Sequence, residues 1–171
     1  SKEHGFYLNC QEFKDIIAFR YDWQITNFPL KCQCGAVNGV DHALSCKLGG
    51  FVHRRHNIIR DLEAEFLQEV CYDVQIEPKL QPVTDDELSA AANNTQDQAR
   101  LDVACRSFWG PMQLSFFDVR ITHPNAPSLR NKEIERILKT NEQEKKRAYN
   151  ERVVEIENGS FTPLVFTTNG M

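Results

Sequence analysis

Three cysteines and a histidine lie close together near the start of the chain, in the order Cys32-x-Cys34, His42 and Cys46. Thiolate sulfur and imidazole nitrogen are the usual ligands of Zn²⁺, and a closed set of four is typical of a structural site. Segment 31–50 shows little apolar periodicity, so a metal would supply folding free energy that a core does not. We therefore expect a structural zinc knuckle.

Two alternatives stay open for this cluster. His53 and His56 could replace His42 as the fourth ligand. The segment could also be a loop of reduced cysteines without a metal, because the single residue between Cys32 and Cys34 is shorter than the usual spacing of two to four.

Two aspartates, Asp102 and Asp118, lie in segments that otherwise resemble β-strands, and apolar side chains flank both. A lone carboxylate is costly to bury. Two carboxylates that meet across paired strands can instead bind Mg²⁺, which activates water and stabilises the leaving oxygen in phosphodiester cleavage. The alternative is that both acids face solvent or pair with Arg100 and Arg120.

Further side chains could assist such a site. Arg120, or a lysine of the late helical segment, Lys145 or Lys146, could offset the negative charge that develops in the transition state. Glu65 is a weaker candidate for a third metal ligand, with a solvent-facing role as its alternative. The lysines could equally form a solvated basic stripe.

A basic group opens the helical segment that begins near residue 56. Helix N-termini attract phosphate, and arginine adds bidentate hydrogen bonds. This pattern favours contact with a phosphate backbone, whereas the alternative is a solvated helix cap. The candidates for binding DNA are Arg54, Arg55, His56 and Arg60.

Apolar periodicity predicts the elements that would position these groups. Helices are expected at 11–22, 56–71 (with Asn57 as N-cap) and 129–150, and strands at 73–80, 100–106, 112–122, 153–157 and 161–168. Leu101, Val103 and Cys105 would share one face of their strand. Strands 100–106 and 112–122 would form a hairpin, Asn158-Gly159 predicts a turn between the last two strands, and the acidic segment 83–98 resembles a surface loop. The order indicates an α/β or α+β fold.

The composition is that of a domain of ordinary size, with 171 residues, 41% hydrophobic and 26% charged. It excludes wholesale disorder and a coiled-coil rod, and no apolar run approaches the roughly 20 residues of a membrane span.

Residues 61–99 carry 1 basic and 10 acidic side chains, whereas residues 100–152 carry 11 basic and 7 acidic. A local basic face is therefore compatible with the net charge of -4. Because the chain begins at Ser1, we expect a fragment of a longer polypeptide.

The order of these motifs resembles the restriction-like endonuclease region at the C-terminus of certain non-LTR retrotransposon polyproteins, the R2-like type. The resemblance covers roughly residues 6–170. It rests on the Cys/His cluster, Arg-His-Asn at 55–57, Ile76-Glu77-Pro78, the two strand aspartates, Lys-Lys-x-x-Tyr at 145–149 and the terminal segment 160–166.

This resemblance implies an α/β fold of the PD-(D/E)xK restriction-endonuclease-like type, a mixed sheet flanked by helices with a small N-terminal zinc knuckle. Residues 1–30 would be a helical lead-in, 31–56 the knuckle and 57–171 the endonuclease domain. The implied activity is Mg²⁺-dependent nicking of target DNA, with Asp102 and Asp118 as the catalytic acids and Lys145 or Lys146 as the catalytic lysine. A nuclear location and a reverse-transcriptase domain in a longer parent polypeptide are also implied.

Two positions depart from the family pattern. Leu101 stands where a proline normally precedes the first aspartate, and Arg120 stands where a lysine is expected after the second. Arginine holds a phosphate well but does not readily transfer a proton. The alternative function is therefore a catalytically inactive, zinc-stabilised nucleic-acid-binding domain in a decayed copy, and a folded remnant without a partner is a third.

Overall fold

The computed structural model describes residues 7–21, 23–25, 28–49, 51–83, 88 and 93–168. The chain divides into two compact units, Ser1–Phe51 and Val52–Met171. The boundary falls where a long helix, α3 (Val52–Val70), begins, so the division expected after residue 56 lies inside that helix. Within the described ranges, no helix has both the length and the apolar character needed to cross a membrane.

The first unit contains two helices, α1 (Cys10–Arg20) and α2 (Val40–Ser45). Asn9 starts α1 with a capping box: its side chain accepts hydrogen bonds from the backbone of the first turn, and the Glu12 carboxylate accepts one from the Asn9 N–H at 2.8 Å. Ala18 is the one buried residue of this helix. Burial of so little apolar surface contributes little stability, which agrees with a segment that needs another source of folding free energy.

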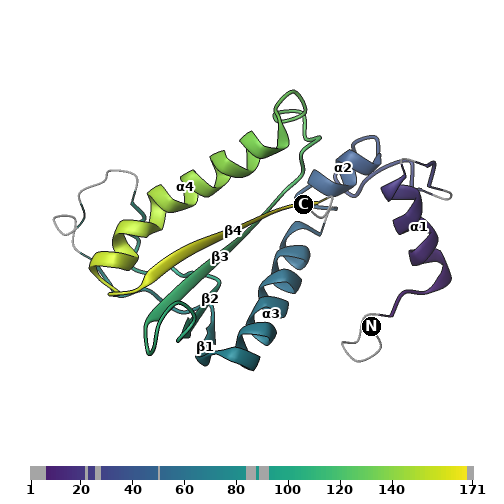
Figure 1. Cartoon of the computed structure of the whole chain (residues 1–171). Helices are drawn as coiled ribbons and strands as arrows, with labels where there is room; N and C mark the ends of the chain where they lie inside the picture. Colours follow the sequence, from purple (N-terminus) through teal and green to yellow (C-terminus); the bar gives the residue numbers. More distant parts are fainter. Residues whose placement is uncertain are drawn as a thin grey trace. The chain divides into compact units, whose positions relative to one another are not determined.

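The second unit is a four-stranded mixed sheet with helices (Figure 1). Its strands are β1 (Tyr72–Ile76), β2 (Val103–Arg106), β3 (Leu114–Thr122) and β4 (Ser160–Thr167), in that spatial order. The β1/β2 and β2/β3 pairs are antiparallel, whereas β3 and β4 are parallel. The parallel pair needs a crossover connection, which helix α4 (Ile134–Glu155) provides. The predicted α/β class with a mixed sheet is confirmed.

Helices α3 and α4 cover opposite faces of this sheet. Successive residues of β3 show the division: Phe116 packs in a cluster that includes Val153 of α4, and Phe117 packs in a cluster that includes Ala64 and Leu67 of α3. Because both faces are covered, β3 is buried continuously from residue 115 to 119. A polar side chain in that stretch is therefore held away from bulk water.

Asp102 marks a break in the alternation of the sheet. The prediction that Leu101, Val103 and Cys105 share one face is wrong, because Leu101 packs on the α4 side and the other two pack on the α3 side. Strand β2 begins only at Val103, but the backbone of Asp102 still donates to the carbonyl of Phe117 at 3.1 Å and accepts from the N–H of Glu77 at 2.8 Å. The change of face between Leu101 and Val103 therefore occurs at a residue whose backbone is fixed on both sides.

Two predicted boundaries are also wrong. Helix α3 begins at Val52, so Asn57 is not its N-cap. Residues 153–155 form the last turn of α4 rather than a strand, and the Asn158-Gly159 turn joins that helix to β4. A Cβ on Gly159 would lie 3.0 Å from the carbonyl oxygen of Leu114, which explains why glycine suits this turn.

Segment 83–98 lies partly outside the described residues, and its described end is fixed to the fold rather than free. The backbone N–H of Asn94 donates to the carbonyl of Ala148 on α4 at 2.8 Å. Arg152, which is fully buried, donates to the carbonyls of Asn94, Gln96 and Gln81 at 2.5, 3.2 and 2.6 Å. This one guanidinium therefore anchors both ends of the segment.

Candidate functional site

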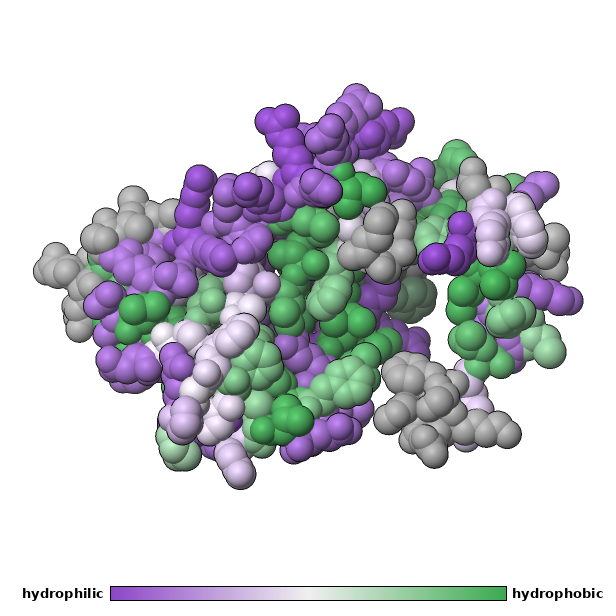
Figure 2. All heavy atoms as spheres, in the orientation of Figure 1, coloured by the Kyte–Doolittle hydropathy of each residue, from purple (hydrophilic) through white to green (hydrophobic). Residues whose placement is uncertain are grey.

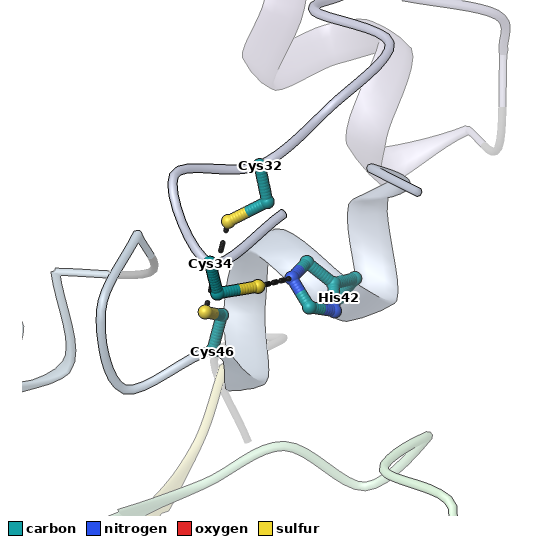
Figure 3. A group of neighbouring side chains, drawn as sticks. All are labelled: Cys32, Cys34, His42 and Cys46. Carbon is teal, nitrogen blue, oxygen red and sulfur yellow. Dashed lines mark hydrogen bonds between the residues drawn. The ribbon is translucent and has the colours of Figure 1, made fainter. Parts of the chain in front are cut away.

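The first candidate site is the Cys/His cluster of the first unit (Figure 3). The ligand atoms of Cys32, Cys34, His42 and Cys46 all lie within 4.8 Å of one another. His42 is on α2 and Cys46 caps its C-terminus, four residues later, so the helix presents both on one face. These four residues can hold a metal ion such as zinc, and the arrangement selects His42 over His53 and His56.

The sulfur–sulfur distance within the cluster matches a tetrahedral centre, and the sulfur–nitrogen distance is about 0.4 Å shorter than in one. The sulfurs of Cys32 and Cys46 are 3.7 Å apart, and Cys34 Sγ is 3.2 Å from His42 Nε2. With Zn–S near 2.3 Å and Zn–N near 2.0–2.1 Å, the edges of a tetrahedron would be about 3.8 Å and about 3.6 Å. The side chains are thus spaced as if around one small cation.

Two backbone features support metal binding at this cluster. The N–H of Gly49 donates to Cys46 Sγ at 3.3 Å. This hydrogen bond, helped by one from Leu48, outweighs desolvation and lowers the pKa of the Cys46 thiol to about 6, which favours the thiolate that a metal needs. A Cβ on Gly49 would lie 2.5 Å from Cys32 Sγ, so any other residue there would push the sulfur out of its place in the cluster.

The second candidate site is centred on Asp118, in the middle of β3. This aspartate is 6% exposed, and its Oδ2 lies 2.5 Å from Nζ of Lys145 on α4. Burial raises the pKa of Asp118 to about 6, although the Lys145 ammonium opposes the shift and the nearby Asp102 reinforces it. The carboxyl group is therefore poised to hold a proton more strongly than an exposed aspartate does.

Asp102 approaches the same place from the start of β2. Its Oδ2 accepts a hydrogen bond from the backbone N–H of Val119 at 2.6 Å and lies 3.1 Å from Nε2 of His56 on α3. Burial alone would raise the pKa of Asp102, but the hydrogen bonds from His56 and Val119 outweigh it and leave the pKa below its ordinary value. Asp102 is thus the carboxylate that stays ionised.

The two aspartates interact electrostatically: burial is the main cause of the raised pKa of Asp118, and the nearby Asp102 carboxylate adds to it. Asp102 directly precedes Val103, the first residue of β2, and Val103 pairs with Phe117, the neighbour of Asp118. Lys145 of α4 contacts Asp118 and His56 of α3 contacts Asp102, so both helical layers contribute to one site.

Glu63, which the sequence analysis missed, faces this site from α3. Its Oε2 is buried and has no hydrogen-bond partner among the described residues. Burial, with the negative charge of Asp102 as a second cause, raises the pKa of Glu63 to about 7. Glu65, the predicted weak ligand, is exposed on the same helix. The helical spacing could have indicated Glu63, because it lies seven residues after His56 and so on the same face.

An apolar cleft of about 310 Å³ adjoins Glu63. It lies between α3 and β4, on the face of the second unit where apolar side chains gather in Figure 2. The lining residues are Ile59, Leu62, Glu63, Phe66, Leu164 and Phe166. These apolar neighbours give the Glu63 carboxyl little solvation, which is the physical reason for its raised pKa.

The remaining predicted site residues lie elsewhere. Lys146 pairs with Glu142 at 2.6 Å on the exposed side of α4, and Arg120 pairs with Glu144 at 2.8 Å. Arg60 is engaged by the carboxylates of Asp61 and Glu77. Of the two candidate lysines, Lys145 is the one placed against the aspartates.

The predicted DNA-binding residues separate in the same way. Arg54 is exposed and Arg55 half-buried in the first turn of α3, whereas His56 is directed to Asp102.

Comparison of the chain with protein-family models and with curated proteins found no match. The functional argument therefore depends on the geometry of the two sites.

Proposed function

We propose that the second unit is a Mg²⁺-dependent endonuclease domain of the PD-(D/E)xK type that nicks DNA, and that the Cys/His cluster of the first unit holds structural zinc. The observation that supports this proposal best is the convergence of Asp102, Asp118 and Lys145. An acid just before β2, an acid in β3 and a lysine from α4 lie together beside the start of β2, which is the arrangement that the family resemblance implies.

The residues present suit Mg²⁺. Mg²⁺ prefers oxygen ligands and is commonly bound through one or two carboxylates, with waters and substrate phosphates completing its shell. Asp102 and Asp118 offer two interacting carboxylates, and no other described Asp, Glu, His or Cys forms a three-ligand group with them. Bound there, Mg²⁺ would activate water and neutralise charge on a scissile phosphate.

Lys145 would act on the substrate directly. Its ammonium, already beside Asp118, is suited to donate a hydrogen bond to a phosphoryl oxygen as negative charge develops there. Helix α4 fixes the lysine because the helix packs on β3 and β4 through the cluster that contains Val153. The lysine of this site therefore comes from the crossover helix, and Arg120 supports α4 through Glu144.

DNA would approach over the first turn of α3. Arg54 and Arg55 lie two and one residues before His56, which contacts Asp102, so a phosphate bound by these arginines at the first turn of α3 would lie at the end of the helix that is near the acids. Arg60 already has two carboxylate partners and is less suited to this role. A DNA substrate fits a nuclear location, and the resemblance fits a parent polypeptide with a reverse transcriptase.

The zinc in this proposal is structural. Four protein ligands close the coordination shell and leave no open position for substrate. The metal would fix Cys32 and Cys34, which lie in a tight loop, to helix α2, in a unit whose helices bury few residues. Its contribution is therefore folding free energy rather than chemistry.

Nicking of supercoiled plasmid by the full chain tests the proposal. Mg²⁺ should be omitted rather than chelated, because a chelator would also remove zinc. The isosteric variant Asp118→Asn should lose at least about 100-fold of the nicking rate while duplex DNA affinity stays near that of the wild type. If Asp118→Asn cuts as well as the wild type, the site is wrongly assigned.

The same preparation separates the alternative function. A chain that binds duplex DNA, with affinity that falls steeply as salt rises, yet does not nick in Mg²⁺ or Mn²⁺, would be a zinc-stabilised nucleic-acid-binding domain. Arg54→Ala should reduce the slope of log affinity against log salt by about 1. A chain with neither property would be a folded remnant.

A further inference from the structure

We propose that His56 is a positioning residue, which fixes the orientation of the Asp102 carboxylate so that one of its oxygens is presented to a divalent cation. The inference rests on the proposed nuclease function and extends it to a residue on α3. Sequence reasoning had placed His56 among the DNA-binding residues or as a substitute zinc ligand.

The tautomer of His56 follows from its partners. Its Nε2 lies 3.1 Å from Asp102 Oδ2 and 3.1 Å from the carbonyl oxygen of Val119. Both partners are acceptors, so Nε2 carries the proton and donates to both. The ring is thereby held against the carboxylate of β2 and the backbone of β3 at once, and its orientation is fixed.

The Asp102 carboxylate is fixed in turn. Its Oδ2 accepts one hydrogen bond from His56 and a second from the Val119 N–H at 2.6 Å. Neither bond uses Oδ1. Hydrogen bonds from outside the ligand set commonly orient metal-binding carboxylates in this way, and their removal typically costs about 10- to 100-fold in metal affinity or activity. With only the backbone bond left, the carboxylate could rotate.

A purely structural role for His56 predicts a different outcome. If the residue only ties α3 to the sheet, its removal lowers stability, and activity falls in proportion to the fraction of unfolded chain. If it positions Asp102, a folded variant binds the divalent cation more weakly. Glutamine and asparagine distinguish the two roles, because the Gln side-chain amide can reach the position of Nε2 and the shorter Asn amide cannot.

The test measures Mn²⁺ binding by electron paramagnetic resonance and Mg²⁺-dependent plasmid nicking on the zinc-loaded full chain. Asp102→Asn defines the Mn²⁺ that binds elsewhere, and His53→Gln, an exposed position on the same helix turn, is the matched control. We expect His56→Asn to weaken Mn²⁺ binding and to slow nicking by about 10- to 100-fold. His56→Gln should recover most of both losses, and His53→Gln should change neither.

Each outcome decides between the claims. Equal losses in His56→Gln and His56→Asn, or no loss in either, would overturn the positioning role, as would a loss that only follows the melting temperature. If the wild type binds Mn²⁺ at Asp102 but does not nick, the proposed nuclease function fails. The positioning role of His56 is then still tested by the Mn²⁺ affinity of its variants. If the wild type neither nicks nor binds Mn²⁺ in an Asp102-dependent way, both proposals fail.

Discussion

Nζ of Lys145 and Oδ2 of Asp118 form an ion pair 2.5 Å long between α4 and β3. The aspartate side chain is 8% exposed and the lysine side chain 23%, so both groups have lost much of their hydration. Ion pairs buried to this degree are often no more stabilising than apolar side chains of the same volume. Stability alone therefore does not explain why this pair is present.

Substitution of the two neighbouring lysines should separate catalysis from surface charge. Lys145→Ala removes the cation beside Asp118 and should slow Mg²⁺-dependent nicking by roughly 10²- to 10³-fold. Lys146→Ala removes the same charge from a side chain that pairs with Glu142 on the exposed face, and nicking should fall less than about threefold. Single-turnover rates on supercoiled plasmid measure both. Equal effects of the two substitutions would contradict the assignment of Lys145.

Removal of zinc should unfold the first unit and leave the sheet of the second intact. The second unit has its own apolar clusters on both faces of the sheet, whereas the first depends on the Cys/His cluster. After chelation, hydrogen exchange should accelerate across residues 30–49 and stay unchanged in β3. One zinc ion per chain should be found before chelation by elemental analysis. Unchanged exchange in residues 30–49 would rule out a structural metal.

Gly49→Ala offers a milder version of the same test. The new Cβ would contact Cys32 Sγ, so zinc affinity should fall by about 10-fold or more. Gly39→Ala, where an added Cβ meets no atom within 4 Å, is the matched control and should bind zinc as the wild type does.

The stability of the second unit should fall as the pH rises through neutrality. The pKa of Glu63 is about 7 in the fold against an ordinary 4.5, so the folded state keeps a proton that the unfolded chain releases. This stabilising contribution is complete below about pH 4.5 and is lost as the pH rises through about 7. The pKa of Asp118 is raised from 3.8 to about 6, so this group adds a further loss of stability over an overlapping pH range.

Glu63→Gln should therefore flatten the dependence of unfolding free energy on pH. Between about pH 5 and about pH 8 the wild type should lose about 1–2 kcal/mol more than the variant, because partial exposure screens the interaction. Urea unfolding followed by Trp109 fluorescence in a Trp23→Phe background reports on this unit. Glu65→Gln, an exposed position on the same helix, is the control. Parallel pH curves for wild type and Glu63→Gln would contradict the prediction.

Arg152 should be essential for stability although it is far from any chemistry proposed for the chain. Arg152→Lys keeps the charge but not the fork of donors that reaches Asn94, Gln96 and Gln81. We expect a loss of about 2–4 kcal/mol, because hydrogen bonds to a buried charge are left unmade. Arg136→Lys, exposed on the same helix, should change stability by less than about 0.5 kcal/mol.

The sequence predicted those parts of the fold in which local pattern and final environment agree. Helix α3 has a regular apolar stripe, and β3 is rich in apolar residues and buried from residue 115 to 119 because both of its faces are covered. The end of α4 was mistaken for a strand, since Val153 and Val154 have β-branched side chains. Burial of Val153 against the sheet overrides that local preference.

The residues of the candidate site were likewise predictable only where the local sequence pattern is unusual. Asp102, Asp118 and the Cys/His cluster were found because a carboxylate or a thiol in such a context is unusual. Glu63 and the role of His56 were missed, because their significance depends on which face of α3 meets Asp102. That face is set by packing between elements distant in sequence. The choice between Lys145 and Lys146 likewise depends on which face of α4 packs on the sheet, and this orientation is not visible in the sequence.

The bond from the Val119 N–H to Asp102 Oδ2 has an evolutionary consequence. The side chain of residue 102 accepts the Val119 N–H beside the start of β2, so, under the proposed nuclease function, a lineage that lost DNA cleavage would still be selected to keep that aspartate for folding. The ion pair between β3 and α4 has no such second purpose. Among related copies, drift should therefore erase Lys145 and Asp118 first, and a copy that retains both is the better candidate for an active one.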